Sequence, residues 1–126
     1  MRPEEFFLRD IVIACRNANK FASEIDQEEF EKSDLHQAAI QYNLLIIGEA
    51  ASHISRALKS RYNNVEWRAL KDFRNVLAHD YFALDREVVW DSAIRNAPTI
   101  SAQIEEILNI EFPDFPVPKD AKLWRS

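Results

Sequence analysis

The chain has 126 residues, a net charge of −5 and one glycine. A sheet protein of this length needs several glycines in its turns, so the composition favours helices within one domain. The negative charge argues against a protein that coats nucleic acid, no apolar run is long enough to cross a membrane, and the lone Cys15 excludes a disulfide framework and a thiolate metal cluster. Because the N-terminus also lacks a signal-peptide pattern, we expect a cytoplasmic protein.

The first predicted helix runs from Pro3 to Ala22. Pro3 suits a first helical turn, and apolar residues recur after it at helical spacing. They are Ile11, Ala14, Cys15, Ala18 and Phe21. The acidic stretch SEIDQEEFEKSD that follows is predicted to be a polar connection.

A second helix is predicted from Ser33 or Asp34, which are good N-caps, to about Arg61. Its apolar stripe would be Leu35, Ala38, Ala39, Tyr42, Leu45 and Ile46. The same stripe continues to Glu49, where a carboxylate takes the place of an apolar residue. Gly48 beside it would allow close approach of another backbone.

The third predicted helix covers about 66–82, and the fourth covers about 86–109 after a cap at Asp85. Pro98 lies inside the fourth and should kink or restart it. Four amphipathic helices with short connections predict an all-α, four-helix up-and-down bundle over residues 1–110. Residues 111–126 are proline-rich, and we expect an extended tail there.

The stretch FRNVLAHDYF, residues 73–82, places Arg74, His79 and Tyr81 within eight positions of a predicted helix. Arg74 and His79 are five residues apart, about 140° around an ideal helix. One straight helix does not easily aim both at one small target. A symmetric dimer would bring each motif beside its own copy, so we expect a homodimer.

Arginine and histidine together suit a phosphodiester. The guanidinium pairs with phosphate oxygens and stabilises developing charge, and the imidazole transfers protons near neutral pH. RNA carries its own nucleophile, the 2′-OH, so such a pair could cleave it without a metal. The alternative is structural. His79 would then lie near the last helical carbonyls, and Arg74 would pair with Asp72 or Glu49.

The residues RNVLAHDY fit R-x4-H-x-Y in full and resemble the HepT-like branch of the HEPN superfamily. The segments LLIIGEAASHI and NAPTISAQIEEIL are similar to the second and last helices of that family. The resemblance extends from about Ile11 to Leu108. It implies a dimeric helical bundle that acts as an RNase toxin, paired with a MntA-type nucleotidyltransferase antitoxin and able to form larger hetero-oligomers with it.

The resemblance also implies roles for single residues. Arg74 would stabilise the phosphate, His79 would transfer protons, and Asn75 would help orient the scissile phosphate. The antitoxin would transfer AMP to Tyr81 and so block the site. ATP and Mg²⁺ would be bound by that partner, and this chain would need no cofactor or metal of its own.

A basic stretch precedes the motif. From Arg56 to Arg74 there are six basic residues and two acids. If the chain is a toxin, this stretch would follow the RNA backbone, with contacts from Lys71 and Arg68. Otherwise it is a solvated helix end or a docking face for an acidic partner.

Two residues that could support the site, Glu49 and Asp72, each allow two interpretations. Glu49 could orient Arg74 or His79, or could pair with Arg74 for structure alone. Asp72 could hydrogen-bond Asn75 or His79, or could simply be solvated.

Two broader alternatives remain. The trio Glu49, His53 and His36 on one predicted helix is weak evidence for a metal site, because no second Glu/His set accompanies it. The chain could also be a non-catalytic binding subunit that presents nucleotide or substrate to a nucleotidyltransferase partner.

Overall fold

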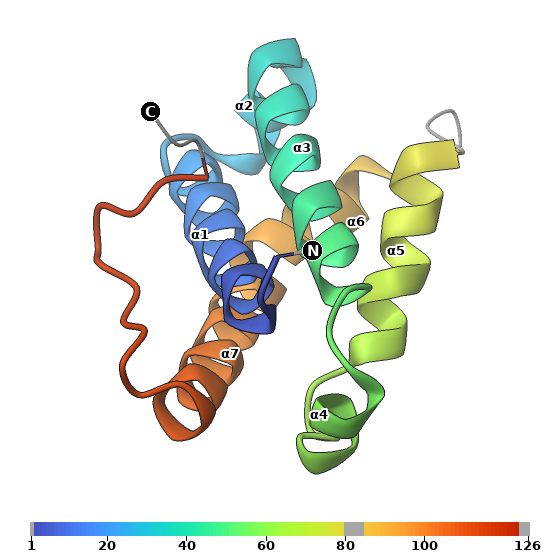
Figure 1. The fold of residues 1–126 in the computed structure, drawn as a ribbon. Coiled ribbons are helices and arrows are strands. Elements are labelled where there is room, and N and C mark those ends of the chain that lie inside the picture. The colour runs from blue at the N-terminus through green and yellow to red at the C-terminus, as the bar shows by residue number, and fades with distance from the viewer. Residues whose placement is uncertain (1, 80–84, 124–126) are drawn as a thin grey trace.

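The computed structural model describes residues 2–79 and 85–123. This part of the chain is helical and contains no strand, which confirms the expected all-α class (Figure 1). Its elements are α1 (Glu4–Ser23), α2 (Gln27–Lys32), α3 (Asp34–Ala51), α4 (Arg56–Arg61), α5 (Trp67–His79), α6 (Arg86–Asp91), the π-helix η2 (Ser92–Asn96) and α7 (Ala97–Glu111). None of these described helices is long and apolar enough to span a membrane.

Helix α1 lies at the centre of the fold. It packs against both α3 and α7. All five consecutive residues from Ile11 to Cys15 are therefore buried, as expected of a helix that is covered on several sides. The remaining long helix, α5, packs mainly on α3 and stands at the edge of the bundle (Figure 1).

Helices α3 and α5 approach most closely at Gly48. A Cβ atom built on Gly48 would lie 2.2 Å from Cβ of Arg74 and 2.7 Å from the carbonyl oxygen of Leu70. No side chain fits in that space, so the expectation of a close backbone approach at this glycine is confirmed. The contact sets α5 against α3 at the position of Arg74.

The prediction of one helix from Ser33 to Arg61 was wrong. Helix α3 ends at Ala51, and a second short helix, α4, begins after Ser55. The Ser55 hydroxyl accepts a hydrogen bond from the N–H of Leu58 at 3.1 Å and so caps α4. Ile54, buried between the two helices, anchors the turn in the core. The N-cap signal of Ser55 was present in the sequence but was hidden by the continuing apolar pattern.

The predicted inner stripe of α3 was also wrong. Leu35 and Tyr42 are 76% and 47% exposed. The buried positions of α3 are Ile40, Asn43, Leu44, Ile47, Gly48, Ala50 and Ala51. Contacts with α1 and α5 decide which sector of α3 is buried, and several apolar residues remain outside that sector. Glu49 consequently lies at the edge of the buried face and not within it.

The acidic stretch after α1 contains a helix that was not predicted. Asp26 accepts from the N–H of Glu29 at 2.8 Å, and the Glu29 carboxylate accepts from the N–H of Asp26 at 3.2 Å. This reciprocal pair is a capping box, whose Asp-x-x-Glu pattern is visible in the sequence. Phe30 anchors α2 by complete burial.

The predicted disturbance at Pro98 is confirmed. The π-helix η2 ends just before α7, and Pro98 stands in the first turn of α7. Proline has no N–H for a bond to the preceding turn, so the wider π geometry accommodates the break.

After α7, residues 112–123 form no helix or strand and run back along α1 (Figure 1). Phe115 packs edge-on against Phe6, with 4.9 Å between ring centroids. Arg16 donates to the carbonyl oxygen of Pro118 at 2.7 Å. Phe112 also packs against the core, whereas Trp124 lies outside the described residues.

Candidate active site

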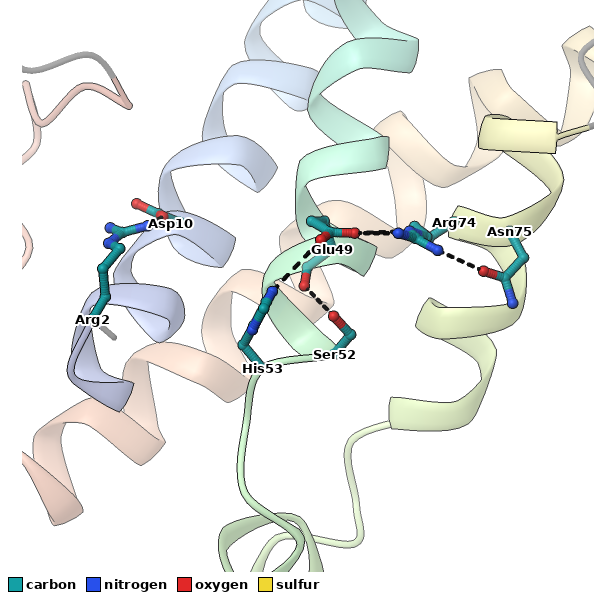
Figure 2. Close-up of polar contacts among 7 residues, drawn as sticks. All are labelled: Arg2, Asp10, Glu49, Ser52, His53, Arg74 and Asn75. Atoms are coloured by element: carbon teal, nitrogen blue, oxygen red, sulfur yellow. Dashed lines mark hydrogen bonds and ion pairs between the residues drawn. The ribbon is translucent and has the colours of Figure 1, made fainter.

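Arg74 and Glu49 face each other across the contact between α5 and α3 (Figure 2). Nε of Arg74 donates to Oε2 of Glu49 at 2.9 Å, and Nη2 forms an ion pair with the same oxygen. Nη1 of Arg74 donates to Oδ1 of Asn75 at 2.9 Å. Of the two predicted partners for Arg74, the structure therefore selects Glu49.

These contacts leave part of the guanidinium available. The group has five N–H donors. Glu49 engages the side formed by Nε and Nη2, and Asn75 engages one N–H of Nη1. One N–H on each Nη atom remains without a partner in the described structure, and such donors can bind phosphate oxygens. Glu49 and Asn75 thus position Arg74 and leave two of its donors available.

The Glu49 carboxylate is held in its charged form. The hydrogen bond from Arg74 is the main cause that lowers the pKa of Glu49 below its ordinary value. Partial burial opposes this effect, and the charges of Arg74 and His53 add to it. An anionic Glu49 is therefore present beside Arg74 throughout the neutral pH range.

His53 contacts the other side of Glu49. The side chains of Asn75, Arg74, Glu49 and His53 thus form a polar chain across the site. Its Nε2 lies 3.5 Å from Oε1 of Glu49, and its ring stacks on Phe7 with 4.6 Å between centroids and 11° between planes. Our sequence analysis treated His53 only as a weak metal ligand. The spacing of four residues from Glu49 was a usable signal, whereas the contact with Phe7 depends on the packing of α1.

The site opens to solvent. The side chains of Arg74 and Glu49 are 31% and 44% exposed. Ion pairs with this exposure contribute only about 0–1 kcal/mol to stability. The main consequence of the pair is therefore the orientation of the guanidinium.

The structure describes the other predicted residues of the motif only in part. Asp72 is exposed, and its side chain has no hydrogen bond within the described part of the chain, as its solvated interpretation predicted. The backbone of α5 is described up to His79, but the His79 side chain lies outside the described structure. Tyr81 also lies outside the described residues.

The two predicted RNA-contacting residues, Arg68 and Lys71, lie on α5 and are both exposed. Lys71 is three residues before Arg74 and thus shares a face of the helix with it. A basic edge therefore leads along α5 toward Arg74.

The trio considered for a metal is not brought together. His36 lies in the first turn of α3, where Ser33 and Glu24 are its neighbours. Glu49 is thirteen residues further along the helix, roughly 20 Å away. Among the described residues, no group of three or more His, Cys, Asp and Glu side chains could hold a metal ion.

An apolar hollow of about 540 Å³ lies on another side of α5. Its walls include Leu44 and Ile47 of α3, Phe73 of α5, and Val88 and Ile100 of the C-terminal helices. The Arg74 and Glu49 side chains are not among its lining residues. The polar chain is thus a separate feature of the surface.

Comparisons with known proteins identify the same family that the R-x4-H-x-Y motif resembles. A family model described as "Ribonuclease HepT-like" matches residues 11–107. "Probable ribonuclease HepT" of Thermococcus cleftensis is 30% identical over 106 residues, which cover 84% of this chain and 96% of that protein. A protein of Methanocaldococcus jannaschii named as a candidate RNase is 31% identical over 104 residues, covering 82% of this chain and 95% of that protein.

A second candidate RNase of the same organism is 31% identical over 102 residues, covering 81% of this chain and 84% of its own length. No solved structure matches the chain significantly. The family match includes Glu49, Arg74 and Asn75, and the tail lies beyond it. The chain therefore belongs to the HepT-like ribonuclease family.

Proposed function

We propose that this protein is a metal-independent endoribonuclease and the toxin of a toxin–antitoxin system. The observation that carries the proposal is the position of Arg74, which keeps two N–H donors available while Glu49 and Asn75 hold the other three. Membership of the HepT-like ribonuclease family and relatives that are named as ribonucleases support RNA as the substrate.

In this proposal, the 2′-OH of RNA attacks the adjacent phosphorus and the bond to the 5′-oxygen breaks. Arg74 binds the non-bridging oxygens, where negative charge increases in the transition state. His79 moves protons between the 2′-OH and the departing 5′-oxygen. The Asn75 amide nitrogen, which has no partner in the described structure, is available to orient the phosphate.

The protein would act in the cytoplasm as a homodimer, because positions five apart, such as 74 and 79, lie about 140° apart around an ideal helix. Its partner would be a MntA-like nucleotidyltransferase that binds ATP and Mg²⁺ and transfers AMP to the phenol of Tyr81. Such a modification would add bulk and negative charge two residues from His79 and so would block RNA.

Two observations favour a second function. Arg74 is already paired with Glu49, and the net charge of the chain is −5, which opposes RNA binding in general. The alternative is a non-catalytic helical subunit that presents nucleotide or substrate to a nucleotidyltransferase.

Cleavage of tRNA and mRNA in EDTA tests the choice. We expect the wild-type protein to produce fragments that end in 2′,3′-cyclic phosphate, and the Arg74→Ala and His79→Ala variants to lose at least about 100-fold in rate. His36→Ala is the matched control, since His36 lies in the first turn of α3 beside Ser33. Equal products from all four proteins, or none from unmodified wild type, would favour the binding subunit.

Intact mass spectrometry after co-expression with the nucleotidyltransferase tests the proposed neutralisation. We expect one or more AMP masses on the wild-type chain and none on Tyr81→Phe. Tyr42→Phe is the control, because Tyr42 is an exposed tyrosine on α3. Addition that persists in Tyr81→Phe would assign the acceptor elsewhere.

A further inference from the structure

The basic side chains of the described structure differ in whether they pair with a carboxylate. Six form ion pairs: Arg2, Arg16, Lys32, Arg61, Arg74 and Arg95. Nine have no carboxylate partner within the described residues, and four of these are neighbours in the sequence: Arg56, Lys59, Arg68 and Lys71. These four lie together on α4 and the first half of α5, so the chain keeps a local positive charge despite its net charge of −5.

Within this group, Lys59 and Lys71 are both neighbours of Trp67. The Lys59 ammonium lies 5.9 Å from the centroid of the Trp67 ring. Trp67 begins α5, and Lys71 follows one turn later on the same face. Burial, and then repulsion by Lys71, lower the pKa of Lys59.

Helix α4 cannot easily move to relieve this repulsion. Its N-terminal end is tied to α1, because the N–H of Ser55 donates to Glu4. Its C-terminal end is tied to α7, because Arg61 and the Tyr62 hydroxyl bind the Glu111 carboxylate at 2.8 and 2.7 Å. The fold therefore holds Lys59 beside the first turn of α5, and neither Lys59 nor Lys71 forms an ion pair within the described residues.

We propose that Lys59 and Lys71 form a subsite for a backbone phosphate of the RNA next to the one at Arg74. This inference rests on the proposed ribonuclease function. Lys71 and Arg74 share a face of α5, so a strand bound at Arg74 passes the two lysines. One phosphate between the ammonium groups replaces their repulsion with two attractions.

A phosphodiester strand fits this arrangement better than an acidic protein does. RNA presents one negative charge at every nucleotide, which supplies successive charges to a row of cations. Binding would contribute affinity and register, because phosphate contacts position a nucleic acid without selecting its bases.

The test uses a 2′-O-methyl RNA of about 12 nucleotides, which lacks the 2′-OH nucleophile and cannot be cleaved. We expect Lys59→Gln and Lys71→Gln each to weaken its binding about three- to tenfold. Each should also reduce the slope of log affinity against log salt by about 0.7, the value for one phosphate on a single strand. The double variant should show the same slope as either single variant, because both lysines share one phosphate.

Two further variants separate charge from structure. Lys59→Arg should retain binding, since it keeps the charge. Lys59→Glu should raise the Tm, because repulsion by Lys71 becomes attraction, and should weaken RNA binding. Lys20→Gln is the matched control at an exposed lysine in the last turn of α1.

The outcomes distinguish this inference from the function on which it rests. Unchanged affinity and slope in Lys59→Gln, with RNA still cleaved by the wild type, would overturn the subsite and leave the ribonuclease intact. Reduced binding of an acidic partner with unchanged RNA binding would also overturn it. Failure of the wild type to cleave any RNA would instead overturn the proposed function.

Discussion

Arg74 illustrates how a single side chain can be prepared for a ligand. Its inner donors are bound by Glu49 and Asn75, and its outer donors remain available. The pair with Glu49 is too exposed to contribute much stability. Its consequence is the loss of rotamer freedom at Arg74 before RNA arrives, which lowers the entropic cost of binding.

Replacing Glu49 by Gln should remove the ion pair and keep the shape of the side chain. Because the pKa of Glu49 is lowered in the folded protein, its stabilisation is present above the ordinary carboxyl pKa and is lost as pH falls through the lowered value. Denaturant unfolding should therefore show Glu49→Gln less stable than the wild type near pH 7 by about 0.5–1 kcal/mol. The difference should shrink as the pH falls below the ordinary carboxyl pKa.

Glu31→Gln is the control, since Glu31 is exposed on α2 and has no ion pair within the described residues. A difference between Glu49→Gln and the wild type that stays constant from pH 7 to pH 3 would show that ionisation of Glu49 is not the cause. Cleavage should also slow in Glu49→Gln, because the guanidinium is less firmly oriented.

Between elements, the contact of α3 with α5 determines the geometry of the site. Gly48 lets the two helices meet where Arg74 leaves α5. The two atoms nearest to such a Cβ belong to or adjoin the backbone of α5, so neither can rotate away. The glycine thus couples helix packing to the position of the guanidinium.

Gly48→Ala should destabilise the fold by about 1–3 kcal/mol through overpacking, although alanine has the higher helix propensity. Cleavage should fall as well, because separation of the helices displaces Arg74 from Glu49. Thermal unfolding and the cleavage assay measure the two effects. Ala38→Ser adds one atom at an exposed position of α3 and should change neither. A Gly48→Ala protein as stable and active as the wild type would contradict the close contact.

Across the whole molecule, the tail is part of the packed structure. Arg9 lies with its guanidinium carbon 4.8 Å from the Phe6 ring centroid and 5.4 Å from that of Phe115. Arg16 binds the tail carbonyls of Val117 and Pro118. These contacts are on α1, whereas the candidate site lies between α3 and α5 (Figures 1 and 2).

Phe115→Ala should therefore lower stability without altering the site. Loss of the ring contact and its buried surface should cost about 1–2 kcal/mol and lower the Tm by several degrees. RNA affinity should remain that of the wild type. Asp114→Ala, at an exposed neighbouring position, is the control. A fall in RNA affinity at unchanged Tm would instead place the tail in the binding surface.

Local signals predicted much of the secondary structure. The single glycine, the periodic apolar residues of α1 and the position of Pro98 indicated an all-α chain with a disturbed last helix, and the structure agrees. The capping signals at Asp26 and Ser55 could have revealed α2 and α4. Asp26, however, stands in a strongly acidic stretch that indicates a polar connection. Ser55 stands within an apolar pattern that continues past the end of α3 and indicates one long helix.

The buried face of α3 could not be predicted from local sequence signals. This helix carries apolar residues on more than one side, and only contacts with α1 and α5 decide which side is covered. The same packing moved Glu49 from an expected interior position to a half-exposed one.

By itself, the sequence determined the helical class, the R-x4-H-x-Y motif and the family, because propensity, caps and motif spacing depend on neighbouring residues. Only the tertiary structure decided that Arg74 pairs with Glu49, that His53 stacks on Phe7, and that Lys59 lies near Lys71. These contacts join residues that are distant in the chain. They depend on the crossing of helices, which is set by packing of the whole core and not by any local pattern.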